Sequence, residues 1–379
     1  MKPKRILYLF ASYPRWSEGF LRQDLGGLLS SGLHIVAASL FPGDCQVQSG
    51  WPVVTCLSDE VVSHGPSSKG LSWLVPRPLR ASFTMLRHRC LFKRLLQLCR
   101  EEHVSHIHGE FADIAGLFAA KAAAKLKCTY SVGLHADDCL NMKYAPASIL
   151  EKALFATVCN VAARKLLLDN GAIDRERLHL CRHGVDLRFW QYSPSRHVSD
   201  GLDVLFAGRI ASKKGLDLLL EALAQLPESY TLKVAGSGPE EANLRELARR
   251  LGVAGRVTWL GMLGQSALRT MFFTSSCLCV PSVAGRGGMD GVPNVMLEAM
   301  ASGLPVVAFR NGGIGEVLDA ETGFLVEDCS VDALCDAMRH IEGNAAEAEK
   351  RRRAARSRIE EQFDAAMLAR ERAALFEEI

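Results

Sequence analysis

Short apolar runs alternate with helical patterns along nearly the whole chain. In the first half, runs with the length of buried strands recur, and helical stretches such as Gly19–Ser31 and Ile114–Leu126 lie between several of them. The predicted strands of this half are Ile6–Phe10, His34–Ser39, His106–His108, Thr129–Gly133 and Leu178–Cys181. Strands that alternate with helices indicate βαβ units and a parallel sheet.

The second half shows the same alternation more clearly. After the first of its apolar runs, leucines recur at the spacing of one helix face, at positions 216, 219, 220 and 223. The predicted strands here are Val204–Ala207, Leu232–Ala235, Val257–Leu260, Leu278–Pro281, Val306–Phe309 and Phe324–Val326. These units are too many for one sheet, so the sequence predicts an α/β protein of two doubly wound domains.

A polar segment without a sustained period separates the two predicted domains. It contains Tyr192-Ser193-Pro194-Ser195, which is typical of a linker. We therefore place the first domain at 1–186, the linker at 187–202 and the second domain at 203–362. The chain from Ala345 onward is rich in Ala, Glu and Arg, and its last part, 363–379, is predicted to be a C-terminal helix.

Composition narrows the class of protein. The chain has 379 residues, of which 48% are hydrophobic and 23% charged, so it can bury a core and is not disordered. The net charge is 45 − 42 = +3, too small to indicate a nucleic-acid partner. No apolar run approaches the ~20 residues of a membrane-spanning helix, and Ile6–Phe10 is too short for a signal peptide.

The cysteines favour a reducing compartment. Twelve are scattered along the chain, and none forms a Cys-x-x-Cys pair. A structural zinc site would need two such ligand pairs, so the sequence predicts no metal site. Scattered reduced cysteines are typical of a cytoplasmic protein.

One long stretch is basic and free of acids. Val61–Arg100 contains no Asp or Glu, and its Lys and Arg residues are interleaved with apolar side chains such as Trp73, Phe83 and Leu86. The cations of this stretch are Lys69, Arg77, Arg80, Arg87, Arg89, Lys93, Arg94 and Arg100. Such a segment can lie on an anionic membrane surface, or it can be a solvated helix face packed on its own domain.

The richest chemistry lies between Pro281 and Asp328, where a predicted strand is followed by a glycine-rich loop and a helix. Gly287, Gly288 and Gly291 let the backbone approach a ligand. Pro293 suits the first helical position, so the amides of the next two residues would point out of the helix start towards a phosphate. Those two residues are Asn294 and Val295.

Two carboxylates flank this helix start. Asp290 stands in the loop and Glu298 stands eight residues later in the helix. Both side chains could accept hydrogen bonds from sugar hydroxyls in one cleft. The alternative is a capping acid beside the helix N-terminus together with an ordinary surface Glu.

A second loop offers cations at the end of a strand. Arg209 and Lys214 lie between Gly208 and Gly215, directly after the predicted strand Val204–Ala207. Ligands of open α/β sheets bind at this end of the strands, and the two side chains suit phosphate oxygens. The alternative is a pair of solvated loop cations. The nearby Gly236-Ser237-Gly238 is only half of a dinucleotide fingerprint, which argues against a dehydrogenase.

The first half offers two further candidates. His135 follows a predicted strand and could bond a substrate hydroxyl or move a proton. Ser17, Glu18 and Phe20 lie in the loop after the first strand, where Ser17 could equally cap the next helix. The sequence has no Asp-x-Asp, so a carboxylate-held metal that binds a diphosphate is not indicated.

Together these regions resemble the retaining glycosyltransferases of family four, and most of all bacterial exopolysaccharide enzymes of the colanic-acid or amylovoran type. The family's Glu-x7-Glu is matched by Asp290 and Glu298, and its Gly-Arg-x4-Lys-Gly by Gly208–Gly215. Its Gly-Gly-Ile-Pro-Glu is similar to Gly312–Glu316, its Gly-Val-Asp to Gly184–Asp186, and the subfamily's Ser-Glu-Thr-Phe to Ser17–Phe20.

The sequence also departs from this family. Asp290 is one methylene shorter than the usual Glu, and Gly315 replaces a usual Pro. His108-Gly109-Glu110-Phe111 resembles a His-Ala-His-Phe element whose second His is missing.

The resemblance implies the GT-B fold, two facing Rossmann-like domains with parallel sheets, and a C-terminal helix that returns to the first domain. It implies transfer of a sugar from a nucleoside diphosphate sugar to a glycan or lipid-linked acceptor, with retention at the anomeric carbon and without cofactor or metal. Arg209 and Lys214 would bind the diphosphate beside the Asn294 and Val295 amides, within a loop set that includes Gly208, Gly236 and Gly291.

The remaining roles follow from the same resemblance. Asp290 would hold the donor sugar, Glu298 the ribose, and His135 would contact the sugar from the acceptor side. Ser17, Glu18 and Phe20 would border the acceptor. Two alternatives stay open: a nucleotide-sugar epimerase of the same fold, and a non-catalytic sugar- or lipid-binding scaffold.

Overall fold

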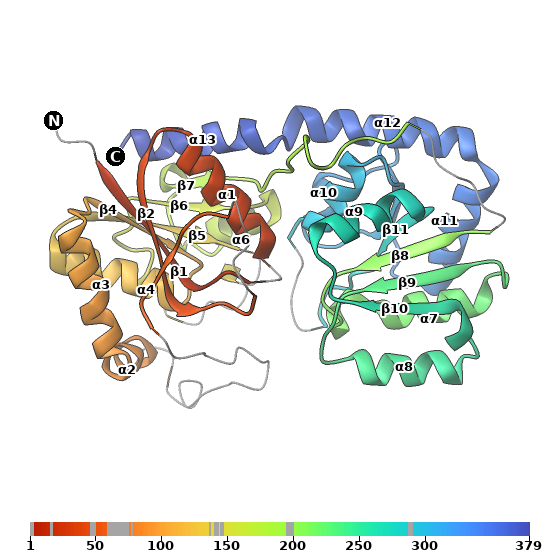
Figure 1. The fold of residues 1–379 in the computed structure, drawn as a ribbon, viewed down its shortest axis with the longest axis horizontal. Helices are drawn as coiled ribbons and strands as arrows, with labels where there is room; N and C mark the ends of the chain where they lie inside the picture. The colour runs from red at the N-terminus through yellow and green to blue at the C-terminus, as the bar shows by residue number, and fades with distance from the viewer. Residues whose placement is uncertain are drawn as a thin grey trace. The chain divides into compact units, whose positions relative to one another are not determined.

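The computed structural model describes residues 4–15, 18–45, 51–58, 76, 79–135, 138–139, 144, 148–194, 201–286 and 291–379. The chain divides into two compact units (Figure 1). Unit 1 comprises Met1–His183 and Ala365–Ile379, and unit 2 comprises Gly184–Asp364. Within the described residues, no helix has both the length and the apolar composition needed to cross a membrane.

Unit 1 is built on a seven-stranded sheet whose strands are all parallel neighbours in the order β3-β2-β1-β4-β5-β6-β7. The strands are β1 (Arg5–Tyr13), β2 (His34–Pro42), β3 (Thr55–Cys56), β4 (His106–Glu110), β5 (Thr129–Leu134), β6 (Phe155–Val158) and β7 (Leu178–Leu180). The short β3 and β6 were not predicted, because two and four residues carry too little pattern to separate them from loop.

Helices cover both faces of this sheet. They are α1 (Gly19–Ser30), α2 (Arg80–Arg87), α3 (Arg89–Glu101), α4 (Ile114–Leu126), α6 (Val161–Asp169) and α13 (Ala365–Glu377). On one face α3 and α4 pack through Leu95 and Phe118. On the other, α1 and α13 pack around Tyr8 and Phe376. Gly27 of α1 permits this packing, since a Cβ there would lie 2.6 Å from the Cβ of Ala369.

Unit 2 contains a six-stranded parallel sheet in the order β10-β9-β8-β11-β12-β13. The strands are β8 (Asp203–Ala207), β9 (Thr231–Ala235), β10 (Val257–Gly261), β11 (Cys277–Val280), β12 (Val306–Phe309) and β13 (Phe324–Val326). The order reverses between β8 and β11, as in dinucleotide-binding α/β sheets, and ligands bind at such a reversal.

Two layers of helices enclose this second sheet. One layer contains α7 (Leu216–Gln225), α8 (Glu241–Arg250) and α11 (Val331–Gly343). The other contains α9 (Gln265–Thr274), α10 (Asn294–Ala301) and α12 (Ala345–Gln362). Each unit is thus an α/β domain built on a parallel sheet, as the sequence predicts.

The boundary between the units differs from the predicted linker. The segment 187–194 belongs to unit 2, because Trp190 is only 1% exposed and its ring packs against Phe272. Arg356 also donates a hydrogen bond of 2.9 Å to the Trp190 carbonyl. A buried tryptophan therefore makes this polar-looking segment part of a domain. Residues 195–200 of the predicted linker lie outside the described residues.

The C-terminal helical region consists of two helices, α12 and α13 (Ala365–Glu377). The predicted boundary at Phe363 falls where α12 ends and α13 begins two residues later. Phe363 is buried in unit 2 and its carbonyl accepts a hydrogen bond of 2.8 Å from Val185. The sequence predicts a return of the last helix to the first domain, and the structure groups Ala365–Ile379 with unit 1.

Candidate active site

The loops at the carboxyl edge of the unit 2 sheet hold one another through backbone contacts. The Gly208 amide donates to the Ala235 carbonyl at 2.9 Å, and the Ile210 amide donates to the Ser237 carbonyl at 2.9 Å. The loops after β8 and β9 therefore run side by side. The Val283 amide donates to the Lys213 carbonyl at 2.8 Å, which joins the loop after β11 to the same group.

Two glycines make this close approach possible. Gly236 has φ of 141°, and a Cβ there would lie 1.9 Å from the Gly208 carbonyl oxygen. Gly215 has φ of 65°, and a Cβ there would lie 1.9 Å from the Pro281 carbonyl oxygen. Side chains at these positions would force the loops apart. The sequence-predicted Gly208 and Gly236 are thus adjacent in the structure.

The two predicted cations of unit 2 stand at the strand reversal. Arg209 lies two residues after the end of β8 and is exposed, whereas the half-buried Lys214 ends the turn before α7. An ion pair of 2.5 Å between Arg286 and Asp217 ties the loop after β11 to α7.

Helix α10 begins beside this loop. Pro293 is the residue before the helix, with φ of −66° and ψ of 121°, and not its first residue as predicted. The extended ψ ends the loop, and Asn294 and Val295 become the first two helical residues. Their amides therefore occupy positions that have no partner within a helix. Gly291 precedes this start and Glu298 lies one turn into α10, while Asp290, Gly287 and Gly288 lie outside the described residues.

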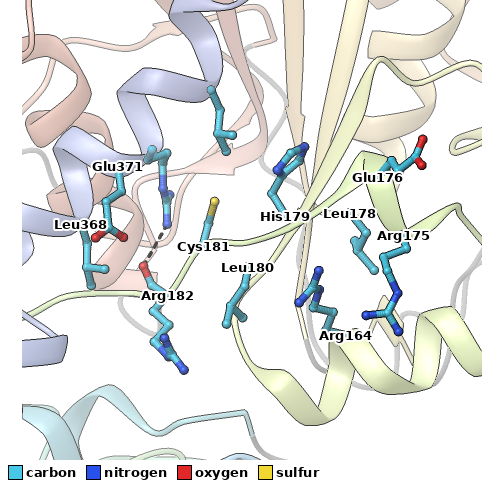
Figure 2. A pocket seen from close by; sticks show the side chains of 12 residues that line it. Arg164, Arg175, Glu176, Leu178, His179, Leu180, Cys181, Arg182, Leu368 and Glu371 are labelled. Carbon is cyan, nitrogen blue, oxygen red and sulfur yellow. Dashed lines mark hydrogen bonds between the residues drawn. The ribbon is translucent and has the colours of Figure 1, made fainter.

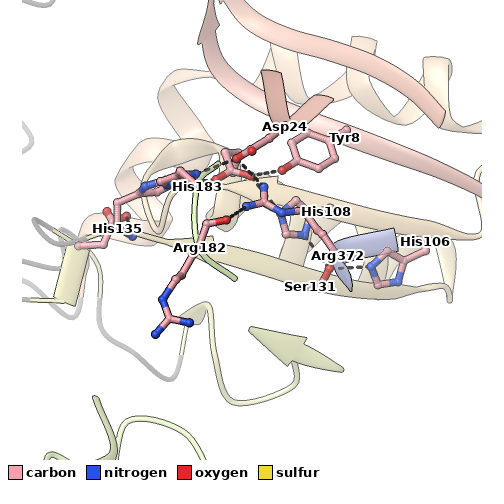
Figure 3. A network of polar contacts seen from close by, with 11 residues as sticks. Tyr8, Asp24, His106, His108, Ser131, His135, Arg182, His183 and Arg372 are labelled. Carbon is pink, nitrogen blue, oxygen red and sulfur yellow. Dashed lines mark hydrogen bonds and ion pairs between the residues drawn. The ribbon is translucent and has the colours of Figure 1, made fainter. Parts of the chain in front are cut away.

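Unit 1 contains a buried polar network centred on Glu110, at the end of β4 (Figure 3). The Glu110 carboxylate accepts hydrogen bonds from Tyr8 Oη, from His108 Nε2 at 3.1 Å and from His135 Nε2 at 2.7 Å. Gly133 on the neighbouring strand leaves room for this carboxylate, because a Cβ there would lie 2.7 Å from Oε1. The predicted site residue His135 thus meets four strand residues, Tyr8, His108, Glu110 and Gly133.

Further hydrogen bonds connect His108 to Ser131 and His106. Ser131 Oγ lies 2.8 Å from His108 Nδ1 and 2.8 Å from His106 Nε2. The other nitrogen of His106, Nδ1, lies 2.8 Å from Thr129 Oγ1, so a chain of hydrogen bonds runs from Glu110 through His108 and Ser131 to His106. Burial lowers the pKa of His106 to about 3, so this imidazole is neutral.

Charge is fixed on the Glu110–His135 pair. Burial raises the pKa of Glu110, but hydrogen bonds from His108 and His135 outweigh burial and hold it well below its usual value. Burial lowers the pKa of His135, but Cys159 and Glu110 outweigh burial and raise it well above its usual value. The pair is therefore an imidazolium and a carboxylate. The His135 amide also donates to Asp138 Oδ2 at 3.0 Å, which fixes the loop after β5.

A second buried ion cluster adjoins the first. Asp24 of α1 accepts hydrogen bonds from His183 Nδ1 at 2.8 Å and from the Arg372 guanidinium of α13 at 2.7 Å. The His135 and His183 rings are parallel, with centroids 5.2 Å apart. Phe20 packs on His183 with a ring separation of 4.1 Å. The predicted acceptor residue Phe20 thus contacts the histidine cluster.

Glu18 lies where the strand order of unit 1 reverses, between β1 and β4. It lines a small cavity of about 60 Å³ together with Arg15 and Phe111. Burial raises the pKa of Glu18 to about 7, against the opposing charge of Arg15, whose guanidinium lies 2.6 Å away. Helix α1 begins after Glu18, whose side chain makes no capping bond. Ser17, with its alternative role as a cap, lies outside the described residues.

A larger cavity of about 330 Å³ lies between β7, α6 and α13 (Figure 2). Arg164, Arg175 and Arg182 line it, as do Glu176 and Glu371. None of the sequence-predicted site residues lines this cavity.

Sequence reasoning missed the residues that organise unit 1. They are Tyr8, Asp24, His108, Glu110, Cys159, His183 and Arg372. Glu110 did leave a signal, because it stands where the family has its second His and is an acid inside a strand. The other six come from six different places in the fold, namely β1, α1, β4, the loops after β6 and β7, and α13, and no local spacing connects them.

The chain is similar to known proteins in sequence and in fold. Residues 192–358 match the family described as glycosyl transferases group 1. WcaL of Escherichia coli (strain K12), assigned to colanic acid biosynthesis as a glycosyltransferase, is 30% identical over 212 residues, 54% of this chain and 52% of WcaL. Glycogen synthase of Mycobacterium tuberculosis (strain H37Rv) is 30% identical over 48% of this chain and 44% of its own. The chain thus spans about half the length of these curated relatives.

Solved structures share the fold over nearly the full chain. Anabaena Alr3699/HepE in complex with UDP has a TM-score of 0.77 and 19% identity, with 99% of this chain and 100% of that chain covered. Sucrose-phosphate synthase of Thermosynechococcus elongatus has a TM-score of 0.75 and 19% identity, with 99% and 98% covered. At this identity the likeness establishes the fold alone.

Proposed function

We propose that the protein is a retaining glycosyltransferase that moves a sugar from a nucleoside diphosphate sugar to an acceptor hydroxyl in exopolysaccharide or cell-surface glycan synthesis. The observation that carries this proposal is the loop set at the strand reversal of unit 2, inside the segment that matches group 1 glycosyl transferases. WcaL, assigned to colanic acid synthesis, supports the class of product, and the structural neighbour bound to UDP supports a nucleotide donor.

The proposed chemistry follows from charge. The leaving diphosphate gains negative charge as the glycosidic bond to the donor breaks, and fixed donors aimed at that charge lower the barrier. Arg209 and Lys214 supply cations, and the Asn294 and Val295 amides supply helix dipoles. The protein carries this positive charge itself, so transfer is proposed to need neither metal nor cofactor.

The other roles concern the sugar and the acceptor. Asp290 would hold the donor sugar and Glu298 the ribose. His135, charged and bonded to Glu110, would donate to a hydroxyl of the sugar. Glu18 lines a cavity and has a pKa of about 7, which suits a group that exchanges a proton with an acceptor hydroxyl. Ser17 and Phe20 would complete that side.

The test is a screen against nucleoside diphosphates and their sugars by thermal shift, followed by transfer assays. A ligand at 100 times its Kd stabilises the protein by about 2.7 kcal/mol. Release of free nucleoside diphosphate only when an acceptor is added, with the anomeric configuration kept, supports the proposal. A new nucleotide sugar formed without acceptor identifies an epimerase, and binding without turnover identifies a scaffold.

A lipid-linked acceptor would bring the protein to the cytoplasmic face of a membrane. Within Val61–Arg100, residues 61–75 and 77–78 lie outside the described residues. The described part presents Arg87, Arg89 and Lys93 as exposed cations beside Leu86, which is 70% exposed. Cations near an anionic surface each contribute about 1 kcal/mol at low salt.

This membrane contact is tested with anionic liposomes. Replacing Arg87, Arg89 and Lys93 together by Gln should lower co-sedimentation while nucleotide binding stays intact. Arg94 is left unchanged, because it donates a hydrogen bond of 2.8 Å to the Leu57 carbonyl. Equal sedimentation of variant and wild type would identify a solvated helix face.

A further inference from the structure

Three metal-binding side chains meet at one corner of unit 1. His135 follows β5, Cys159 follows β6 and His183 lies beyond β7, so each comes from the carboxyl end of one of three adjacent parallel strands. One potential ligand atom from each residue lies within 4.8 Å of the other two. The proposed sugar transfer uses His135 alone and leaves the other two residues without a role.

The two imidazoles are oriented as metal ligands are. His135 Nε2 donates to Glu110 and His183 Nδ1 donates to Asp24, so each ring has one nitrogen held by a carboxylate. Carboxylates in this position fix the tautomer of metal-bound histidines and raise their basicity. The opposite nitrogen of His183, Nε2, is buried, and the His183 ring also interacts with the Cys159 side chain. The His183 side chain is 10% exposed.

Cys159 supplies the sulfur of this group. Its Sγ is one of three potential ligand atoms that lie within 4.8 Å of one another, and a cysteine binds metal as its thiolate. Cys181, two residues before His183, is not part of this group of three.

We propose that His135, Cys159 and His183 form a zinc site with an open fourth position. One thiolate and two imidazoles are a ligand set that Zn²⁺ prefers, and three protein ligands are typical of zinc sites that keep a place for water or substrate. In tetrahedral zinc the ligand atoms lie about 3.3–3.8 Å apart, so small side-chain rotations close the site. Binding would displace the His135 proton to solvent, and zinc would take its place.

Zinc bound at the proposed site would inhibit sugar transfer reversibly. This consequence rests on the proposed function, in which a protonated ring nitrogen of His135 donates a hydrogen bond to a sugar hydroxyl. Zinc on His135 removes that proton, so transfer should stop when zinc binds and resume when EDTA removes it. Zinc should therefore lower the activity of this protein, whereas a metal raises the activity of a metal-dependent transferase.

The binding experiment uses the full chain with the exposed Cys56, Cys90 and Cys329 replaced by Ser, so that surface thiols do not contribute. Competition with a chromophoric chelator should give one zinc per chain. Co²⁺ should give a thiolate-to-metal charge-transfer band. Cys159→Ser should abolish the band and weaken zinc at least 100-fold, and Cys181→Ser is the matched control that should keep both.

Further variants distinguish the loss of a zinc ligand from misfolding. His183→Gln removes a second ligand and should also abolish stoichiometric binding, and Asp24→Asn should weaken zinc 10- to 100-fold as an orienting partner. Unchanged circular dichroism and Tm confirm that each variant is folded. Equal zinc affinity in wild type, Cys159→Ser and His183→Gln would overturn the proposal, as would a wild type that binds no zinc.

Transfer assays separate this proposal from the proposed function. Zinc should inhibit wild type and leave Cys159→Ser active. Stoichiometric zinc binding in a protein that transfers no sugar would support the site and overturn the glycosyltransferase proposal. Strong transfer in saturating zinc would overturn the inhibitory role.

Discussion

The two candidate sites differ in whether backbone or side chains shape them. In unit 2 the backbone shapes the site: glycines let the loops after β8, β9 and β11 touch, and a helix start supplies amides. In unit 1 side chains shape it: Glu110 and Asp24 each join groups from several elements in a buried network. A backbone site tolerates change in many side chains, whereas a buried network depends on every member.

The largest expected effect breaks the unit 1 network. Glu110→Gln leaves Tyr8, His108 and His135 facing an amide in place of a buried carboxylate. Removing one partner of a buried ion pair costs about 3–5 kcal/mol. We expect faster hydrogen exchange in β4 and β5 and unchanged exchange in β8, measured by mass spectrometry.

The control for Glu110 is an exposed pair. Glu102 binds Arg5 at 2.8 Å with both side chains more than a third exposed, so Glu102→Gln should cost less than about 1 kcal/mol. Similar losses in both variants would mean that burial does not distinguish the network. Faster exchange in β8 would mean that the two units do not respond separately.

Next in size is the loss of a cation in unit 2. Arg209→Ala or Lys214→Ala removes a charge that is proposed to face the leaving diphosphate, and such losses lower kcat by about 10²–10³. Lys214→Arg should also be impaired, since the two cations have different shapes. Lys213→Ala is the matched control in the same turn. Wild-type transfer by both Arg209→Ala and Lys214→Ala would refute the assignment.

The same contrast explains what the sequence could predict. Strand periodicity identified most strands of both sheets, and it failed at β3 and β6, which are too short to show a period. The unit 2 loops were predictable because Gly208, Gly236 and Asn294 stand in local patterns beside strands. A positive φ or a helix start is a local property, and it leaves a local signal.

The unit 1 network leaves no such signal. Asp24 and Arg372 are separated by nearly the whole chain, yet they form one ion pair of 2.7 Å. Trp190 shows the same limit, because its polar neighbours predicted a linker and its burial makes it part of unit 2. Tertiary packing decides these positions, and only His135 was identified from its place after a strand.

A smaller effect concerns the charge of Glu18. Its pKa is raised from 4.5 to about 7 by burial, so folding favours the neutral acid. Stability from this residue is therefore present below pH 4.5 and is lost as the pH rises towards about 7. At 1.36 kcal/mol per pH unit, the full shift corresponds to about 3 kcal/mol, and solvent contact reduces this to roughly 2 kcal/mol.

Glu18→Gln should remove this pH dependence. The variant gains stability over wild type as the pH rises from 5 to 8, measured by urea unfolding with a unit 1 probe. Glu101→Gln on the exposed end of α3 is the control and should follow wild type. A parallel pH profile for Glu18→Gln would show that the carboxyl is charged in the folded protein at pH 6.

The smallest expected effect tests whether Asn294 of unit 2 binds a ligand. Asn294 Oδ1, at the start of α10, is buried and has no hydrogen-bond partner among the described residues. A buried acceptor without a partner costs about 1–3 kcal/mol unless a ligand satisfies it. Asn294→Ala should therefore leave the free energy of unfolding within about 0.5 kcal/mol of wild type or raise it, because the lost packing and the removed unsatisfied acceptor offset each other.

The same substitution, Asn294→Ala, should weaken nucleotide binding. If Asn294 Oδ1 accepts a hydrogen bond from the donor nucleotide, Asn294→Ala weakens the Kd of the nucleoside diphosphate about 5- to 10-fold, since one net hydrogen bond contributes about 1 kcal/mol. Isothermal titration measures this, and Asn243→Ala on α8, whose side-chain amide donates to Glu240 at 3.2 Å, is the control. A variant that loses stability and keeps its affinity would show that Asn294 serves the fold. The opposite result would show that even a site shaped by backbone contains a side chain whose role is to bind the ligand.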